Sequence, residues 1–86
     1  MTKRTVIQKA WEVANGRSNY TVATVYRAGR GWDIDYGQNE SDIYHPRDKD
    51  GNQLFATIGR IWDYENYRAT KAEVTEWLFG IDSPLS

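Results

Sequence analysis

Cysteine is absent from this chain of 86 residues, so neither a disulfide nor a thiolate metal site can hold its fold together. A domain of this size buries only a modest share of its surface and needs another source of stability. The chain supplies four tryptophans, six tyrosines and two phenylalanines, and each large ring can bury roughly 150–250 Å². We therefore predict one small domain, residues 1–86, with an aromatic-rich core, and the rings that this core does not need are available for an interface.

A helix is predicted near the N-terminus, over residues 5–15. Its apolar side chains recur at helical spacing and fall within one arc, while the polar ones fall on the other side. Thr5 and Gln8 have the spacing of a capping box at its start. Gly16 stands where a left-handed glycine commonly ends a helix.

A second helix is predicted near the C-terminus, over residues 70–79. Thr70 and Glu73 have the spacing of another capping box, and Gly80 follows the last helical position. The remaining residues, 81–86, are predicted to form a frayed tail.

Two hairpins are predicted between these helices. The first covers residues 20–37, which are rich in β-branched and aromatic types and turn at Gly29-Arg30. This turn places Val25 opposite Ile34 and Ala23 opposite Tyr36 on a core face. The other face, expected to meet water, carries Thr24, Tyr26, Asp33 and Asp35.

The second predicted hairpin covers residues 41–59 and turns at Asp50-Gly51. This turn places Ile43 opposite Ile58, Tyr44 opposite Thr57 and His45 opposite Ala56. Because proline cannot donate to a ladder, Pro46 puts this strand at a sheet edge. The prediction is thus an α+β fold: an N-terminal helix, an antiparallel sheet of about four strands in two hairpins, and a C-terminal helix. Residues 60–69 are left open between strand and loop.

Motifs that carry chemistry are missing. The loop around Asp48 has glycine at the wrong position for an EF-hand, and a hairpin turn explains it better. His45, the only histidine, could act with Asp42 or Asp48 as general acid or base, but a half-buried strand histidine without a chemical role is the simpler interpretation. No nucleophile elbow or nucleotide-binding motif occurs. We therefore predict a protein that is not an enzyme, with no catalytic residue, metal ligand or cofactor.

Charge is distributed unevenly along the chain. Residues 1–30 hold six basic side chains and one acid, whereas residues 31–86 hold eleven acids and five bases. Interleaving of the two halves in the fold would mix these charges, whereas separation would mark a partner of one sign. The net charge of −1 weighs against direct contact with nucleic acid. That contact stays the alternative hypothesis, through Arg4, Lys9, Arg27 and Arg30.

Acids and aromatic residues alternate in the middle of the chain. An acidic surface with aromatic contacts suits a basic groove on a partner, because charge guides the encounter and rings supply the contact area. An ordinary hydrophilic surface would have the same composition, and that interpretation stays open. The residues predicted to bind a protein partner are Trp32, Asp33, Asp35, Tyr36, Glu40, Asp42 and Tyr44.

No apolar stretch is long enough to cross a membrane, and no apolar segment of signal-peptide type follows the charged N-terminus. We therefore expect a cytoplasmic protein with no membrane partner. A homodimer is left open, through an edge strand near Pro46 or through an exposed cluster of Trp62, Tyr64 and Tyr67.

In its size and composition, without any shared motif, the whole chain resembles the small inhibitors encoded by phages and mobile elements, including anti-CRISPR proteins. The resemblance implies a non-enzymatic protein that sterically blocks a nucleic-acid-handling defence complex in the cytoplasm of a host cell. It transfers no residues, and the near-neutral charge departs from the strongly acidic members that mimic nucleic acid.

Overall fold

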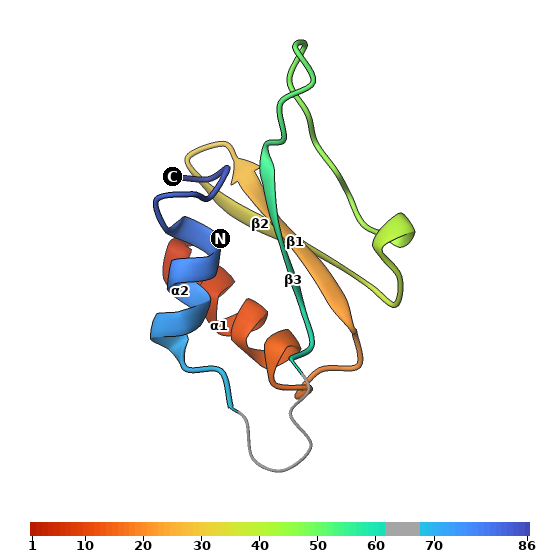
Figure 1. Ribbon diagram of the computed structural model, residues 1–86, viewed down its shortest axis with the longest axis vertical. Helices are drawn as coiled ribbons and strands as arrows, with labels where there is room; N and C mark the ends of the chain where they lie inside the picture. The colour runs from red at the N-terminus through yellow and green to blue at the C-terminus, as the bar shows by residue number, and fades with distance from the viewer. Residues whose placement is uncertain (62–67) are drawn as a thin grey trace.

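The computed structural model describes residues 1–61 and 68–86. A helix precedes the antiparallel sheet in the chain and another follows it, and both helices pack on the same face of the sheet (Figure 1). The predicted α+β class is therefore confirmed. The sheet has three strands, in the order β2-β1-β3, and the prediction of about four is wrong. The elements are α1 (Lys3–Ala14), β1 (Val22–Ala28), β2 (Gly31–Gly37), the short 3₁₀ helix η1 (Glu40–Asp42), β3 (Phe55–Gly59) and α2 (Lys71–Phe79).

Helix α1 begins earlier than its sequence pattern predicts. Thr2 is the N-cap, and its hydroxyl accepts from the Thr5 amide at 3.2 Å. The capping box predicted for Thr5 and Gln8 is wrong, because the Thr2 hydroxyl caps the helix one turn earlier. The Gln8 side-chain amide donates to the Glu12 carboxylate at 3.2 Å instead. Gly16 has φ of 69°, as expected for a glycine that ends a helix.

Helix α2 confirms its predicted capping box. The Thr70 hydroxyl accepts from the Glu73 amide, and the Glu73 carboxylate accepts from the Thr70 amide. Gly80 ends the helix with an ordinary φ of −68°. The residues after it turn back rather than fray, and Leu85 packs against the core.

The first hairpin has its predicted register. Val25 lies opposite Ile34, Ala23 lies opposite Tyr36, and Gly29 in the turn has φ of 60°. The turn and the alternation of apolar residues agree on this register, since a slip of one residue would expose the whole core face.

The second predicted hairpin is wrong. Strand β3 pairs with β1, so Ile58 lies opposite Ala23 and Ala56 lies opposite Val25. Strand β1 is thus central, which explains why its first four residues are buried although successive side chains point to opposite faces. The partners predicted from residues 41–45 contribute nothing to the sheet.

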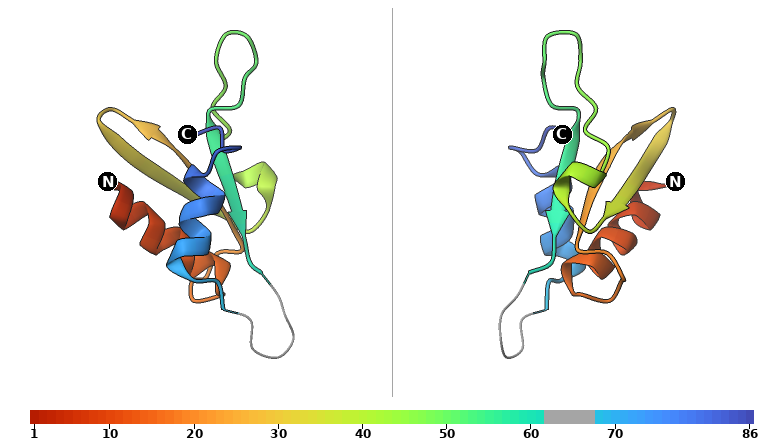
Figure 2. Two further views of the ribbon diagram at one scale, coloured as in Figure 1. Left: turned by 60° about the vertical axis from the view of Figure 1, so that its left-hand side comes forward. Right: turned by 90° about the vertical axis from the view of Figure 1, so that its right-hand side faces the viewer.

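The connection between β2 and β3 crosses the sheet face opposite the helices (Figure 2). Ile43 is 5% exposed there although it belongs to no strand. Pro46 lies in this connection too, so no edge strand runs through it. The chain does turn in this region, but not as the predicted two-residue turn at Asp50-Gly51: the Gly51 amide donates to the Asp48 carbonyl at 3.1 Å, and Gly51 has φ of 84°. One isolated bridge, Arg47 to Gln53, joins the two arms, so their register is shifted by one residue from the predicted one.

The core lies between the two helices and the sheet. Its members are the buried apolar residues of both helices and of the helix-facing side of all three strands, with Ala69. They include Val6, Ala10, Val13, Val25, Trp32, Ile34, Ala56, Ile58, Val74 and Leu78. Within the described residues this core is mainly aliphatic, so the prediction of an aromatic-rich core is wrong. Thr24 faces the other side and is fully buried, although its face was expected to meet water, because the β2–β3 connection covers it. The cluster of Trp62, Tyr64 and Tyr67 lies outside the described residues.

Candidate interaction surface

Strand β2 separates the residues that the sequence predicts as one partner-binding group. Trp32 and Tyr36 point to the helix side, whereas Asp33 and Asp35 point to the face that the β2–β3 connection crosses. Trp32 is 9% exposed and meets the Phe79 ring edge-on, with centroids 4.8 Å apart. It is a core residue, so a partner would not reach most of its ring.

Tyr36 is half-buried beside helix α1. Its ring stacks on that of Tyr20 with centroids 4.8 Å apart. Burial, with the nearby Glu12, Tyr20 and Asp33, raises the pKa of Tyr36 to about 12. This ring therefore belongs to a different side of the molecule from the two aspartates beside it in sequence.

Asp33 and Asp35 close the outer edge of β2. The Trp32 amide donates to the Met1 carbonyl at 2.9 Å, so the main-chain groups of Trp32 turn away from β1. Alternate residues face the same way, and therefore Ile34 and Tyr36 also turn theirs outward. The Ile34 amide donates to Asp33 Oδ1 at 2.8 Å, and the Tyr36 amide donates to Asp35 Oδ1 at 3.1 Å. The outward amides of the strand are thus all satisfied.

Asp35 also holds Tyr44 against the sheet. Its Oδ2 accepts from the Tyr44 amide at 2.8 Å, and the buried Thr24 hydroxyl donates to the Tyr44 carbonyl at 2.8 Å. The Tyr44 ring is nevertheless 54% exposed, and it meets Tyr26 edge-on with centroids 5.0 Å apart. An exposed aromatic side chain is thus carried on a main chain that β1 and β2 both hold in place.

Tyr26 links this aromatic pair to the carboxylates. Burial raises the pKa of Tyr26, and the nearby Asp33 and Asp35 add to the effect, Asp33 also through a hydrogen bond. Glu40 and Asp42 belong to η1, which lies just before Tyr44 in the chain, and both are exposed. We call these six residues the acidic–aromatic surface: Tyr26, Asp33, Asp35, Glu40, Asp42 and Tyr44. Sequence reasoning placed Tyr26 on the right face but left it out of the site, although its alternation with Thr24 was the available signal.

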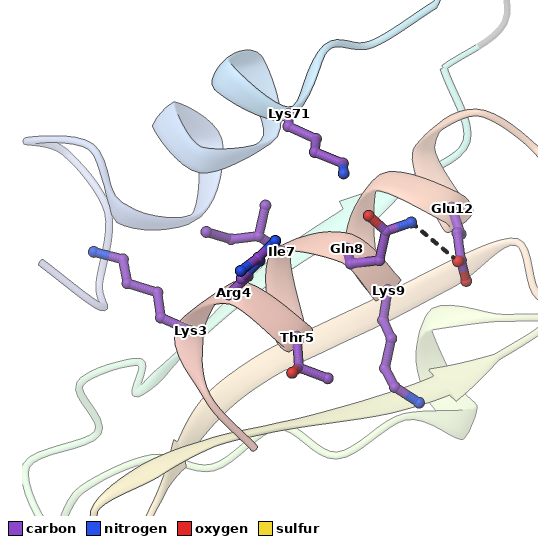
Figure 3. A pocket seen from close by; sticks show the side chains of 8 residues that line it. All are labelled: Lys3, Arg4, Thr5, Ile7, Gln8, Lys9, Glu12 and Lys71. Carbon is purple, nitrogen blue, oxygen red and sulfur yellow. Dashed lines mark hydrogen bonds between the residues drawn. The ribbon is translucent and has the colours of Figure 1, made fainter.

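The basic residues of the alternative hypothesis are only partly brought together. Arg4 and Lys9 line a hollow of about 770 Å³ along α1, together with Lys3 and with Lys71 from α2 (Figure 3). We call these four residues the basic groove. Glu12 is the one acid in its lining. Arg27 and Arg30 are not part of it: Arg30 lies in the β1–β2 turn, and the Arg27 guanidinium lies 4.6 Å from the centre of the Trp32 ring.

The two charged regions lie on opposite sides of the sheet. The helices that carry the basic groove cover one face, and the connection that carries Glu40 and Asp42 crosses the other (Figure 2, right). The basic groove and the acidic–aromatic surface are therefore separated in space, although the helix side also carries Glu73, Glu76 and Asp82 from the acidic half of the chain. Lys71 could not be found by sequence reasoning because its place in the groove depends on how α2 packs against α1, whereas Lys3 lies next to Arg4 in α1 and its neighbourhood was the available signal.

His45 lies outside both regions of charge. Its side chain is exposed rather than half-buried in a strand, and its ring meets Phe55 edge-on with centroids 5.0 Å apart. The described residues contain no group of three His, Asp or Glu side chains arranged to bind a metal ion. None of the helices in the described part of the chain combines the length and the hydropathy that a bilayer-spanning helix needs.

Comparison of this chain with protein families, with curated proteins and with solved structures found no match. The two charged regions and the outer edges of the sheet are therefore the features from which a function can be argued.

Proposed function

We propose that this protein is a non-enzymatic protein-binding module that docks its acidic–aromatic surface on a basic surface of a partner. The observation that carries the proposal is Tyr44, which is 54% exposed while its amide and carbonyl are both hydrogen-bonded to the sheet. Binding energy concentrates in a few aromatic contacts. A ring whose main chain is already ordered loses little entropy when it binds.

The carboxylates around Tyr44 indicate the sign of the partner. A lysine or arginine of the partner could lie over the Tyr44 ring while it pairs with Asp42 or Glu40 at the margin. A partner surface complementary to this one would be basic and able to accept aromatic rings. The surfaces of nucleic-acid-binding proteins have this character, because they bind phosphates and bases. We therefore favour a nucleic-acid-handling complex as the partner and steric exclusion of its nucleic acid as the effect, as the resemblance to small phage inhibitors also implies.

The test compares two exposed tyrosines. The immobilised wild-type protein, Tyr44→Ala and Tyr20→Ala are each exposed to lysate of the source cells, and bound proteins are quantified by mass spectrometry. Tyr20 is 42% exposed and stacks on Tyr36, away from the acidic–aromatic surface, so it is a matched control. We expect a basic nucleic-acid-binding protein to be retained by the wild type and by Tyr20→Ala, with at least about tenfold less on Tyr44→Ala.

The captured protein is then purified and mixed with its own nucleic acid. The proposal requires that the wild-type module displaces the nucleic acid and that Tyr44→Ala does not. Equal capture by all three baits, or capture without displacement, would contradict it.

A second candidate function, direct binding of nucleic acid, is favoured by one observation, the basic groove. Four cations line one hollow beside a single acid, and phosphate backbones bind to such grooves with a strong dependence on salt. A gel-shift titration with single-stranded and duplex DNA across salt concentrations tests it. If the groove binds phosphates, Arg4→Glu and Lys9→Glu should each reduce the logarithmic salt slope by about one, whereas Arg30→Glu should not.

A further inference from the structure

The outer edge of β3 differs from that of β2. The Arg60 amide donates to the Thr21 carbonyl at 3.1 Å, so Arg60 faces the β1 side of the strand. Because alternate residues of a strand face alternate sides, Ala56 and Ile58 face β1 as well. Thr57 and Gly59 therefore turn their main-chain groups away from the sheet.

These outward groups are open over a short stretch. At one end the Phe55 carbonyl accepts from the Gln53 side chain at 2.8 Å, and at the other the Ile61 amide donates to the Ala14 carbonyl at 2.9 Å. Between them, no residue in 1–61 or 68–86 bonds to the outward main-chain groups of Thr57 and Gly59. Gly59 has no side chain, so another backbone can approach closely.

A hollow adjoins this open stretch on the helix side. It has a volume of about 490 Å³, with Ala56 and Thr57 on one wall and Trp77 and Glu76 of α2 on another. Strand β3 lies beside α2 and the C-terminal segment (Figure 2, left). The Trp77 ring is 40% exposed. A strand added to β3 would direct alternate side chains into this hollow, against Trp77.

The charge of the hollow indicates what would enter it. Glu76 and Asp82 line it, and no basic residue does. An occupant that brings lysine or arginine side chains would pair with these acids and could place a cation over Trp77.

We propose that the outer edge of β3 is a binding site for an extended, basic peptide segment of a partner protein, which adds to the sheet as a fourth strand. The main-chain groups of Thr57 and Gly59 supply the ladder, Trp77 supplies the apolar contact, and Glu76 and Asp82 select for positive charge. A second copy of the chain fits less well, because pairing of two β3 edges would bring Glu76 and Asp82 of both copies into one interface, where they would repel. The outer edge of β2 cannot serve as the partner strand, since Asp33 and Asp35 already satisfy its amides.

The probe is a fluorescent peptide of alternating lysine and valine, six residues long, titrated into the protein by polarisation. Its control replaces the central valine by proline, which keeps the charge and removes a ladder donor. We expect the first peptide to bind at least about tenfold more tightly than the second. In amide NMR spectra, the signals of Thr57 and Gly59 should shift, and those of Ile34 and Tyr36 should not.

Three protein variants complete the test. Thr57→Pro removes one outward donor and Glu76→Lys/Asp82→Lys reverses the charge, and each should weaken binding of the alternating peptide by about tenfold or more. Glu40→Lys/Asp42→Lys changes the acidic–aromatic surface and should leave it unchanged. Equal binding of both peptides, or peptide shifts centred on Tyr44, would overturn the proposal. So would sedimentation that shows a dimer which Thr57→Pro dissociates, because the edge would then belong to a second copy.

Discussion

The two edge strands of the sheet, β2 and β3, differ in how their outward main-chain amides are hydrogen-bonded. A free strand edge exposes unpaired main-chain groups and invites pairing with other chains. On β2, Met1 and two aspartates satisfy the outward amides at Trp32, Ile34 and Tyr36. On β3, the stretch from Thr57 to Gly59 is left open among the described residues. The outward amides are thus satisfied on β2 and open on β3, and the peptide site that we propose for β3 rests on this difference.

The comparison also changes how the acids are interpreted. Two carboxylates at i, i+2 on a strand face could serve catalysis, metal binding or a partner. Here each first accepts a hydrogen bond from the strand itself, and Asp35 also holds Tyr44. A substitution at Asp33 or Asp35 would therefore disturb the fold together with any binding, so Tyr44, Glu40 and Asp42 are the better probes of function.

The largest expected effect separates the two sides of β3. Ala56→Pro removes an amide that faces β1 and should reduce the free energy of unfolding by about 3 kcal/mol or more. Thr57→Pro removes an amide that faces outward and should cost less than about 1 kcal/mol. Urea titrations followed by circular dichroism measure both values. Similar losses in the two variants would show that Thr57 is paired and that the edge is not open.

The next effect tests the closed edge. Asp35→Ala leaves the Tyr36 and Tyr44 amides without their carboxylate acceptor, and should reduce the free energy of unfolding by about 2–3 kcal/mol. Asp35→Asn is the matched variant: its single carbonyl oxygen can replace one acceptor but not both, so its loss should be intermediate. If Asp35→Ala unfolded at the same urea concentration as the wild type, the closing role of Asp35 would be wrong.

A smaller contrast is expected in amide hydrogen exchange at neutral pH. The Ile34 and Tyr36 amides, which donate to carboxylates, should exchange about ten to a hundred times more slowly than the Thr57 and Gly59 amides. All four lie in strands, so the difference isolates the pairing of the edge. Equal exchange at both edges would contradict the comparison, and protection at β3 that depends on protein concentration would point to self-association.

The closed edge belongs to the part of the fold that the sequence predicts well. The register of the first hairpin follows from the sequence, since a two-residue turn and alternating side chains both specify the pairing of Val25 with Ile34. The capping box of Thr70 and Glu73 is equally local. These features depend on neighbours a few residues away, which a single sequence displays.

The open edge belongs to the part that could not be predicted. Ile43 and the turn at Gly51 look like half of a hairpin, but Ile43 is buried against the sheet by a loop and β3 finds its partner in β1. Sequential strands pair only about two-thirds of the time, and nothing local shows which strand is central. The acidic–aromatic surface could be predicted only in part for the same reason. Alternation along the strands places Asp33 and Asp35 on one face with Tyr26, but the hydrogen bond between Thr24 and Tyr44 depends on the path of the β2–β3 connection.

The smallest expected effect concerns Tyr36, on the helix side of the closed strand. An unfolded tyrosine ionises near pH 10, whereas burial first, and then Glu12, Tyr20 and Asp33, raise the pKa of Tyr36 to about 12 in the folded protein. Between these values the unfolded chain has released a proton that the folded chain keeps. The free energy of unfolding should therefore be unaffected by this group below about pH 10 and should fall as pH rises toward 12.

Tyr36→Phe should remove that part of the alkaline loss. Solvent screens a half-buried ring, so the difference from the wild type should be modest. Urea titrations at about pH 9 and about pH 11 measure it, and tyrosinate absorbance reports the ionisation directly. The matched variant is Tyr26→Phe, because burial with Asp33 and Asp35 also raises the pKa of Tyr26 and the same sign applies on the opposite face of the sheet. The prediction would be wrong if the wild type and Tyr36→Phe lost the same free energy of unfolding between the two pH values. Tyr36 would then ionise as freely in the folded protein as in the unfolded chain.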